Sequence, residues 1–123
     1  MKKITILLSL LLFFCCGTLM AEEFVPKRAS IENNGQKIEV KDLSKLPVFY
    51  ADYYRNEDVV KISSSAGHLT LKKGNFFYSC RGMRNGLLIT ATAYVSNGKI
   101  EKIVYEEYDK SKNMTAVINY FKK

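Results

Sequence analysis

An Asn-Gly pair at positions 97 and 98 constrains the fold of this chain more than any other feature of its sequence. The pair lies between Leu87–Val95 and Ile100–Tyr108, two stretches rich in the β-branched and aromatic residues that favour strands. Asn-Gly is typical of a two-residue type I′ turn, because both central residues of that turn need a positive φ. The pattern therefore predicts an antiparallel hairpin.

The same turn predicts which side chains share a face of the hairpin, because side chains alternate between the two faces of a strand. We expect one face to enter the core, with these opposed pairs: Val95 and Ile100, Ala93 and Lys102, Ala91 and Val104, Ile89 and Glu106. The other face carries Tyr94 and Glu101, Thr92 and Ile103, Thr90 and Tyr105, Leu88 and Glu107. This second face is half polar and half aromatic. Its candidate binding residues are Thr90, Thr92, Tyr94 and Tyr105.

Short stretches of strand-forming residues, separated by turn residues, precede the hairpin. The predicted strands are Lys37–Lys41, Val48–Tyr54, Val59–Ser63, Leu69–Lys72 and Asn75–Cys80. A short helix is the alternative for Val48–Tyr54. We expect a single helical turn over Asp42–Leu46 that ends before Pro47, because the residue before a proline avoids the helical region.

The segment Asn113–Phe121 is open to two interpretations. Met114, Val117, Ile118 and Phe121 have the spacing of an amphipathic helix, but the segment is also rich in strand formers, and we prefer a strand. Many short strands and no long helix predict a mainly β fold of antiparallel hairpins or a meander. An α+β fold with a short C-terminal helix is the alternative.

The first 21 residues have the composition of a secretory signal peptide. Lys2 and Lys3 precede an uncharged apolar run, Ile4–Cys16, which is shorter than the roughly 20 residues that span a membrane. It fits the apolar region of a signal peptide, and Ala21 suits the position before the cleavage site. An uncleaved N-terminal anchor is the alternative.

A lipid anchor is not expected, because Cys15 follows Phe14 instead of the small residue typical of a bacterial lipobox. We predict a bacterial protein that is periplasmic or secreted, with no transmembrane span after cleavage. Residues 1–21 are the expected signal peptide, 22–36 an extended leader that ends in a turn, and 37–123 a single small β-rich domain.

The charges are distributed unevenly along the chain. From Val59 to Ile100 there is no Asp or Glu, whereas Lys61, Lys72, Lys73, Arg81, Arg84 and Lys99 all lie there. Such a basic face could meet an anionic surface, or its lysines could simply keep strand edges solvated, which we prefer. Lys72, Lys73, Arg81 and Arg84 join the candidate binding residues. An exported protein is not expected to bind nucleic acid.

The sequence contains no pattern typical of a catalytic or metal site. His68 is the single histidine and lies in a predicted turn. The acidic residues Glu106, Glu107 and Asp109 are interpreted as a solvated strand end. Cys80 is the one cysteine that remains after cleavage, so we expect no internal disulfide and a thiol that behaves as a small buried hydrophobe.

Three segments share an Asn followed by Gly or Glu and then a strand of apolar and basic residues. They are YYRNEDVVKI (Tyr53–Ile62), MRNGLLI (Met83–Ile89) and YVSNGKIEKIVYEEY (Tyr94–Tyr108). This pattern resembles the MORN-type hairpin repeat of bacteria, over Val48–Lys123 at most. The resemblance implies stacked hairpins in an open, elongated sheet. Glu57 stands where that repeat has its turn glycine.

A rival resemblance rests on GNFFYSCRG (Gly74–Gly82) and LLITATAYVSNGKIEKIVYEE (Leu87–Glu107). These segments resemble the core of exported flavin-mononucleotide-binding domains. That resemblance implies FMN as cofactor and Thr115, in KNMTA, as the residue that takes the flavin. Thr115 lacks the glycine or alanine that precedes the threonine in the family's motif, and our preferred prediction has no cofactor.

We predict a non-enzymatic binding or structural protein of the bacterial cell envelope, whose partner is an envelope protein or an anionic surface. One alternative is a flavin carrier in envelope electron transfer. Another is an inhibitor or immunity protein that blocks a secreted enzyme. The sequence leaves the oligomeric state open.

Overall fold

The computed structural model describes residues 21–65 and 67–123, and these residues form nine strands and no helix. The strands are β1 (Glu22–Asn33), β2 (Gln36–Glu39), β3 (Phe49–Tyr54), β4 (Val59–Ser64), β5 (Gly67–Lys73), β6 (Tyr78–Arg84), β7 (Leu87–Ser96), β8 (Lys99–Asp109) and β9 (Met114–Lys122). The predicted signal peptide, apart from Ala21, lies outside the described residues.

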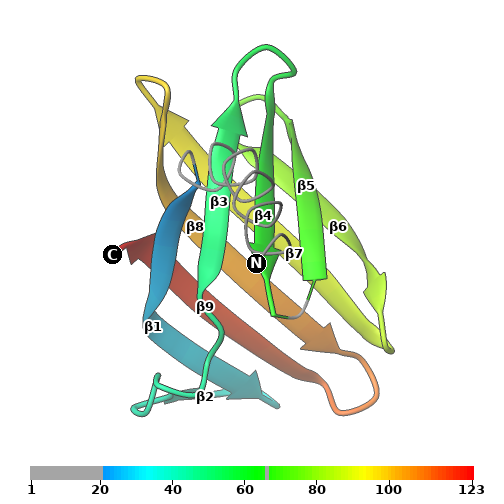
Figure 1. Cartoon of the computed structure of the whole chain (residues 1–123). Helices are drawn as coiled ribbons and strands as arrows, with labels where there is room; N and C mark the ends of the chain where they lie inside the picture. Colours follow the sequence, from blue (N-terminus) through cyan, green and yellow to red (C-terminus); the bar gives the residue numbers. More distant parts are fainter. Residues whose placement is uncertain (1–20, 66) are drawn as a thin grey trace, which may run out of the picture.

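The strands form one antiparallel sheet that closes on itself (Figure 1). From β3 to β9 each strand pairs with the next one in the chain, and β1 pairs with both β3 and β9. The result is an eight-stranded barrel, with β2 paired to the end of β1 as a flap outside the ring. The predicted mainly β, antiparallel fold is confirmed. The C-terminal segment is a strand, β9, as we preferred.

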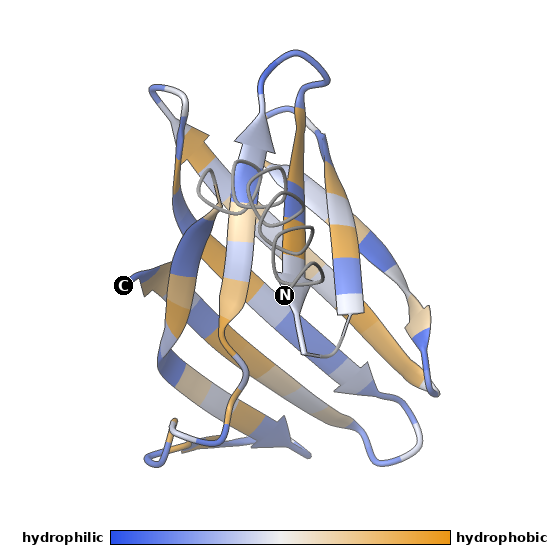
Figure 2. Ribbon diagram, viewed as in Figure 1, coloured by the Kyte–Doolittle hydropathy of each residue, from blue (hydrophilic) through white to orange (hydrophobic). Residues whose placement is uncertain are grey.

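Alternation along the strands places the core inside the barrel, and Figure 2 shows it as alternating hydrophobic and hydrophilic bands. Fully buried side chains include Phe24, Val60, Leu71, Ile103 and Tyr120. Aromatic rings pack together in the core: Phe49 of β3 stacks on Tyr120 of β9, with 4.0 Å between ring centroids. The Tyr120 hydroxyl donates a 2.9 Å hydrogen bond to the Pro47 carbonyl.

Asn-Gly pairs form three of the hairpin turns. Asn97 and Gly98 have φ values of 54° and 76°, as the type I′ prediction requires. The pairs at 34–35 and 85–86 also have positive φ at both residues and join β1 to β2 and β6 to β7.

The predicted register of the β7–β8 hairpin is right at its tip and wrong beyond it. Val95 pairs with Ile100 as expected, but Tyr94 pairs with Lys102, so Glu101 is the extra residue of a β-bulge. A one-residue shift moves every later side chain to the other face. Ile103 is therefore fully buried, and Tyr105 joins the inward side instead of the face that carries Thr90, Thr92 and Tyr94.

Two other expectations change in detail. The segment expected as an extended leader is extended, but as β1 it lies within the sheet, where it pairs with β9 along most of its length. The Asp42–Leu46 segment forms a turn, with the Leu46 amide donating to the Leu43 carbonyl over 3.2 Å. The three MORN-like segments all lie in hairpins of the closed sheet.

Within residues 21–65 and 67–123, no helix has the length and apolar character needed to cross a membrane.

Candidate ligand-binding site

A cavity of about 220 Å³ opens inside one end of the barrel; we call it the mouth cavity. It lies at the end where β4 turns into β5 and β6 turns into β7. Its lining residues are Leu46, Pro47, Phe49, Ile62, Ser64, Gly67, Leu69, Arg84, Tyr105, Glu107 and Ile118. Small barrels commonly hold ligands in their mouths, and these walls are mostly apolar.

The polar groups of the mouth cavity carry both signs of charge. Arg84 enters from the end of β6 and Glu107 from β8, and both are half-buried. The Tyr105 hydroxyl donates a 2.9 Å hydrogen bond to Glu107 Oε2. Burial and then this hydrogen bond raise the pKa of Tyr105, while Arg84 opposes the rise. The phenol therefore remains a protonated donor at neutral pH.

Gly67 makes room for Arg84. A Cβ atom placed on Gly67 would lie 3.3 Å from Arg84 Nη1, and the φ of Gly67 is +131°. The guanidinium thus lies against the start of β5, where a side chain would crowd it. Arg84 thus lies at the boundary between the mouth cavity and a second cavity.

The neighbouring cavity, of about 250 Å³, lies along β5 and β6; we call it the seam cavity. Its lining residues are His68, Leu69, Thr70, Cys80, Arg81, Gly82, Met83, Arg84 and Ile89. β5 and β6 are paired only at Lys72 with Ser79 and at Lys73 with Tyr78, and they diverge beyond these pairs (Figure 1). Leu69 and Arg84 line both cavities.

Cys80, on the seam cavity, should react slowly with alkylating reagents. Burial raises the pKa of its thiol, and the thiolate is the reactive form. We expect the cleaved protein at neutral pH to be alkylated by iodoacetamide several-fold more slowly than free glutathione. Unfolding in urea should remove the difference, and mass spectrometry measures both rates. Equal rates in the folded state would contradict the burial of this thiol.

No family model matches the chain, and no curated protein or solved structure is significantly similar to it.

The structure distributes the candidate binding residues of the hairpin face and of the basic stretch over several parts of the barrel. Arg84 and Tyr105 line the mouth cavity, and Arg81 lines the seam cavity with Arg84. Thr90, Thr92 and Tyr94 lie on β7, and neither cavity includes them. Lys72 is exposed on β5. Lys73 lies at the far end of the barrel, with its Nζ 3.7 Å from Asp58 Oδ2.

Sequence reasoning missed Glu107 and the apolar walls of the mouth cavity. Of the acidic residues near the end of β8, Glu107 points into the mouth cavity. Asp109 instead lies at the turn that follows β8, where its Oδ1 accepts hydrogen bonds from the Ser111 amide and hydroxyl. Among the described residues, no group of His, Cys, Asp and Glu side chains could hold a metal ion. Thr115, the residue implied to take a flavin, lines neither cavity.

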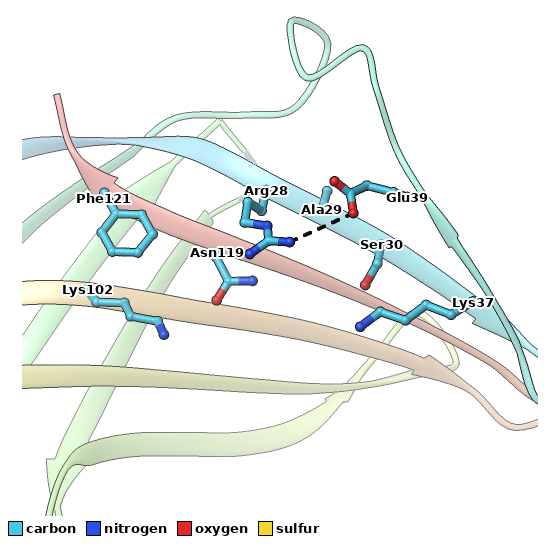
Figure 3. Close-up of a pocket in the computed structure, with 8 residues that line it drawn as sticks. All are labelled: Arg28, Ala29, Ser30, Lys37, Glu39, Lys102, Asn119 and Phe121. Atoms are coloured by element: carbon cyan, nitrogen blue, oxygen red, sulfur yellow. Dashed lines mark ion pairs between the residues drawn. The ribbon is translucent and has the colours of Figure 1, made fainter.

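A third hollow, of about 240 Å³, lies on the outside of the barrel beneath β2 (Figure 3). Arg28 of β1 and Glu39 of β2 approach across it, with 3.9 Å between their charged atoms. Lys102 and Phe121 lie at its other side, where the Lys102 ammonium is 5.8 Å from the ring centroid. Strongly exposed charges dominate this hollow, so we favour the mouth cavity as the ligand site.

A polar cluster lies at the barrel end opposite the mouth cavity. The Tyr78 hydroxyl donates to Asp58 Oδ1, and the Tyr53 hydroxyl lies 3.3 Å from the same oxygen. The hydrogen bond from Tyr78 is the main cause that lowers the pKa of Asp58, and Lys73 adds to the effect. The cluster ties the β3–β4 turn to the start of β6.

This cluster makes stability depend on pH in the acid range. A carboxyl with a lowered pKa in the folded state stabilises the fold above its unfolded pKa of about 3.9. That contribution is lost as the pH falls through the folded pKa. We expect wild type to be more stable than Asp58→Asn near neutral pH, and the difference to shrink below about pH 4. Asn tolerates the positive φ at this position.

Urea unfolding of both proteins at several pH values measures this difference. Tyr78→Phe is the matched control, because it removes the main donor and should reduce the pH dependence that belongs to Asp58. A difference between wild type and Asp58→Asn that stays constant down to pH 3 would contradict the assigned role.

Proposed function

We propose that this is an exported, non-enzymatic binding protein of the bacterial envelope that holds a small, uncharged, amphipathic molecule in its mouth cavity. One observation carries the proposal: an apolar-walled cavity ends at a protonated phenol, a carboxylate and a guanidinium. The apolar part of a ligand would contact Phe49, Ile62 and Ile118. Its polar end would exchange hydrogen bonds with Arg84 and Glu107.

The two opposite charges favour a neutral ligand. A carboxylate in the cavity would lie near Glu107, and an ammonium would lie near Arg84. Burying either charge beside a group of the same sign is unfavourable. A hydroxyl or amide can instead donate to the carboxylate and accept from the guanidinium.

The volume supports a small ligand. Sites for drug-sized molecules occupy roughly 300–1,000 Å³, whereas this cavity has about 220 Å³. It therefore supports the flavin-carrier alternative less well than the binding of a single-ring or short-chain compound. We propose binding in place of catalysis because His68, the single histidine, does not line this cavity.

Three probes of matched size test the proposal: benzyl alcohol, benzoate and benzylamine. Titration followed by methyl NMR should shift the signals of Ile62, Leu69 and Ile118, while Ile103, buried elsewhere in the core, serves as reference. We expect benzyl alcohol to bind about tenfold more tightly than either charged probe, because each charged probe loses solvation beside a like charge. Equal binding of the three, or shifts away from the cavity, would overturn the proposal.

A cavity-filling variant provides the matched comparison. Leu46 lines the mouth cavity, whereas Leu43, half-buried in the same segment, does not. Leu46→Phe should abolish the shifts caused by benzyl alcohol, and Leu43→Phe should leave them unchanged. Circular dichroism checks that both variants keep the fold.

A further inference from the structure

At the β5–β6 seam, parts of these two strands are not paired with each other, although the rest of the sheet is closed. β4 and β5 pair at six positions and β6 and β7 at seven, whereas β5 and β6 pair at two. No β5–β6 pair is formed by Gly67–Leu71 of β5 or by Cys80–Met83 of β6. Alternate N–H and C=O groups of a strand point to each side, so the Cys80–Met83 edge that faces away from β7 presents backbone hydrogen-bonding groups.

Gly82 lies in the middle of this edge and adds a second observation. A Cβ atom built on Gly82 would meet nothing within 4 Å, and its φ is not positive, so no turn requires glycine there. Glycine within a strand often marks a place where another backbone approaches closely. Such an approach would occupy the seam cavity, which Gly82 lines.

The charges around the seam limit what can approach. Strands β4, β5, β6 and β7 contain no Asp or Glu, and the lining of the seam cavity includes the exposed Arg81 but no carboxylate. A second copy of the chain would bring the same basic edge, and like charges in such a symmetric contact repel. The seam therefore complements an acidic occupant.

We infer that the β5–β6 seam is a strand-addition site for an extended segment of a partner protein in which apolar and acidic residues alternate. The alternation follows from the strand geometry, because successive side chains of an added strand point to opposite sides. Inward side chains would meet Leu69 and Ile89. Outward carboxylates would meet Arg81, which is exposed on β6. This inference does not depend on the ligand of the mouth cavity.

A synthetic peptide of about six residues that alternates valine and glutamate tests the inference. Its binding to the full folded protein should slow deuterium exchange at those amides of Cys80–Met83 that face the seam, and should slow alkylation of Cys80. Protection of another strand in place of β6 would overturn the inference.

Two further probes check the pattern and the charge. The same peptide with lysine in place of glutamate should not bind, and a peptide of glutamate alone should bind about tenfold more weakly, because it lacks the apolar side chains that enter the cavity. Equal binding of either peptide would overturn the inference. So would protection by vesicles of anionic phospholipid without protection by the alternating peptide, because it would assign the seam to a membrane surface.

Charge reversal provides the matched variants. Arg81→Glu should weaken the alternating peptide about tenfold or more, because it places like charges together. Arg28→Glu makes the same change at an exposed position of β1, on the opposite side of the barrel from the seam, and should leave binding unchanged. Equal effects of the two variants would show that net charge alone attracts the peptide and would overturn the inference. Both side chains are exposed, so neither change should unfold the protein.

Discussion

Phe49→Ala is expected to destabilise the protein by about 3–5 kcal/mol, the range measured when a buried aromatic ring is removed. The Phe49 side chain is 3% exposed. It stacks on Tyr120 and meets the edge of Tyr105 at 5.5 Å between centroids. The change therefore removes apolar contacts and two ring pairs at once, on the wall of the mouth cavity.

Denaturant unfolding and thermal melting measure this effect. A loss of that size should lower Tm by more than about 10 °C. If the alanine variant does not fold, Phe49→Leu retains much of the buried area and loses only the ring contacts, which are worth about 0.5–1.5 kcal/mol per pair. The matched control is Phe76→Ala, because Phe76 is 88% exposed and should change stability little. Similar effects at positions 49 and 76 would contradict the core assignment.

Gly98→Val is expected to give the second-largest loss of stability. Gly98 has a φ of +76°, which a β-branched residue strongly resists, and such backbone strain costs about 1–3 kcal/mol. A Cβ atom there would also lie 2.2 Å from Arg55 Nη2, so the Arg55 side chain must move. Both effects lower the free energy of unfolding.

Two other glycines separate these effects. Gly86 has a φ of +80° and nothing within 4 Å of a built Cβ, so Gly86→Val adds backbone strain alone. Gly82 has no positive φ and also has open space, so Gly82→Val should be nearly neutral. We expect the order of destabilisation Gly98→Val, Gly86→Val, Gly82→Val in urea unfolding. An unchanged melting temperature for Gly98→Val would contradict the structural role of the turn.

The local elements could be predicted from the sequence because their signals are local. Asn-Gly needs only two residues to specify a type I′ turn, and alternation from Ile89 to Val95 identifies the buried face of β7. The bulge at Glu101 has no such signal, since Lys102 and Ile103 fit either face until the partner strand is known. That single extra residue is why the sequence pattern predicts Tyr105 and Glu107 on the outer face, whereas both line the mouth cavity.

The cavities could not be predicted, because they depend on contacts between distant segments. The mouth cavity joins Leu46, before β3, to Ile118 on β9. Barrel closure itself rests on pairing between the two ends of the described chain, with Phe24 opposite Lys122. The sequence shows that Val59–Ile100 contains no Asp or Glu. Only the fold shows that this stretch forms four consecutive strands on both sides of the seam.

The pairing of β1 with β9 has a consequence for how the protein is made. During synthesis β1 is made before the other strands, yet most of its paired residues lie opposite β9. Contacts between such distant residues slow folding, so the barrel cannot close until nearly the whole chain is available. A chain that stops before β9 would leave the edges of β1 and β8 open, and open edges promote aggregation. Closure of this small barrel thus depends on complete synthesis.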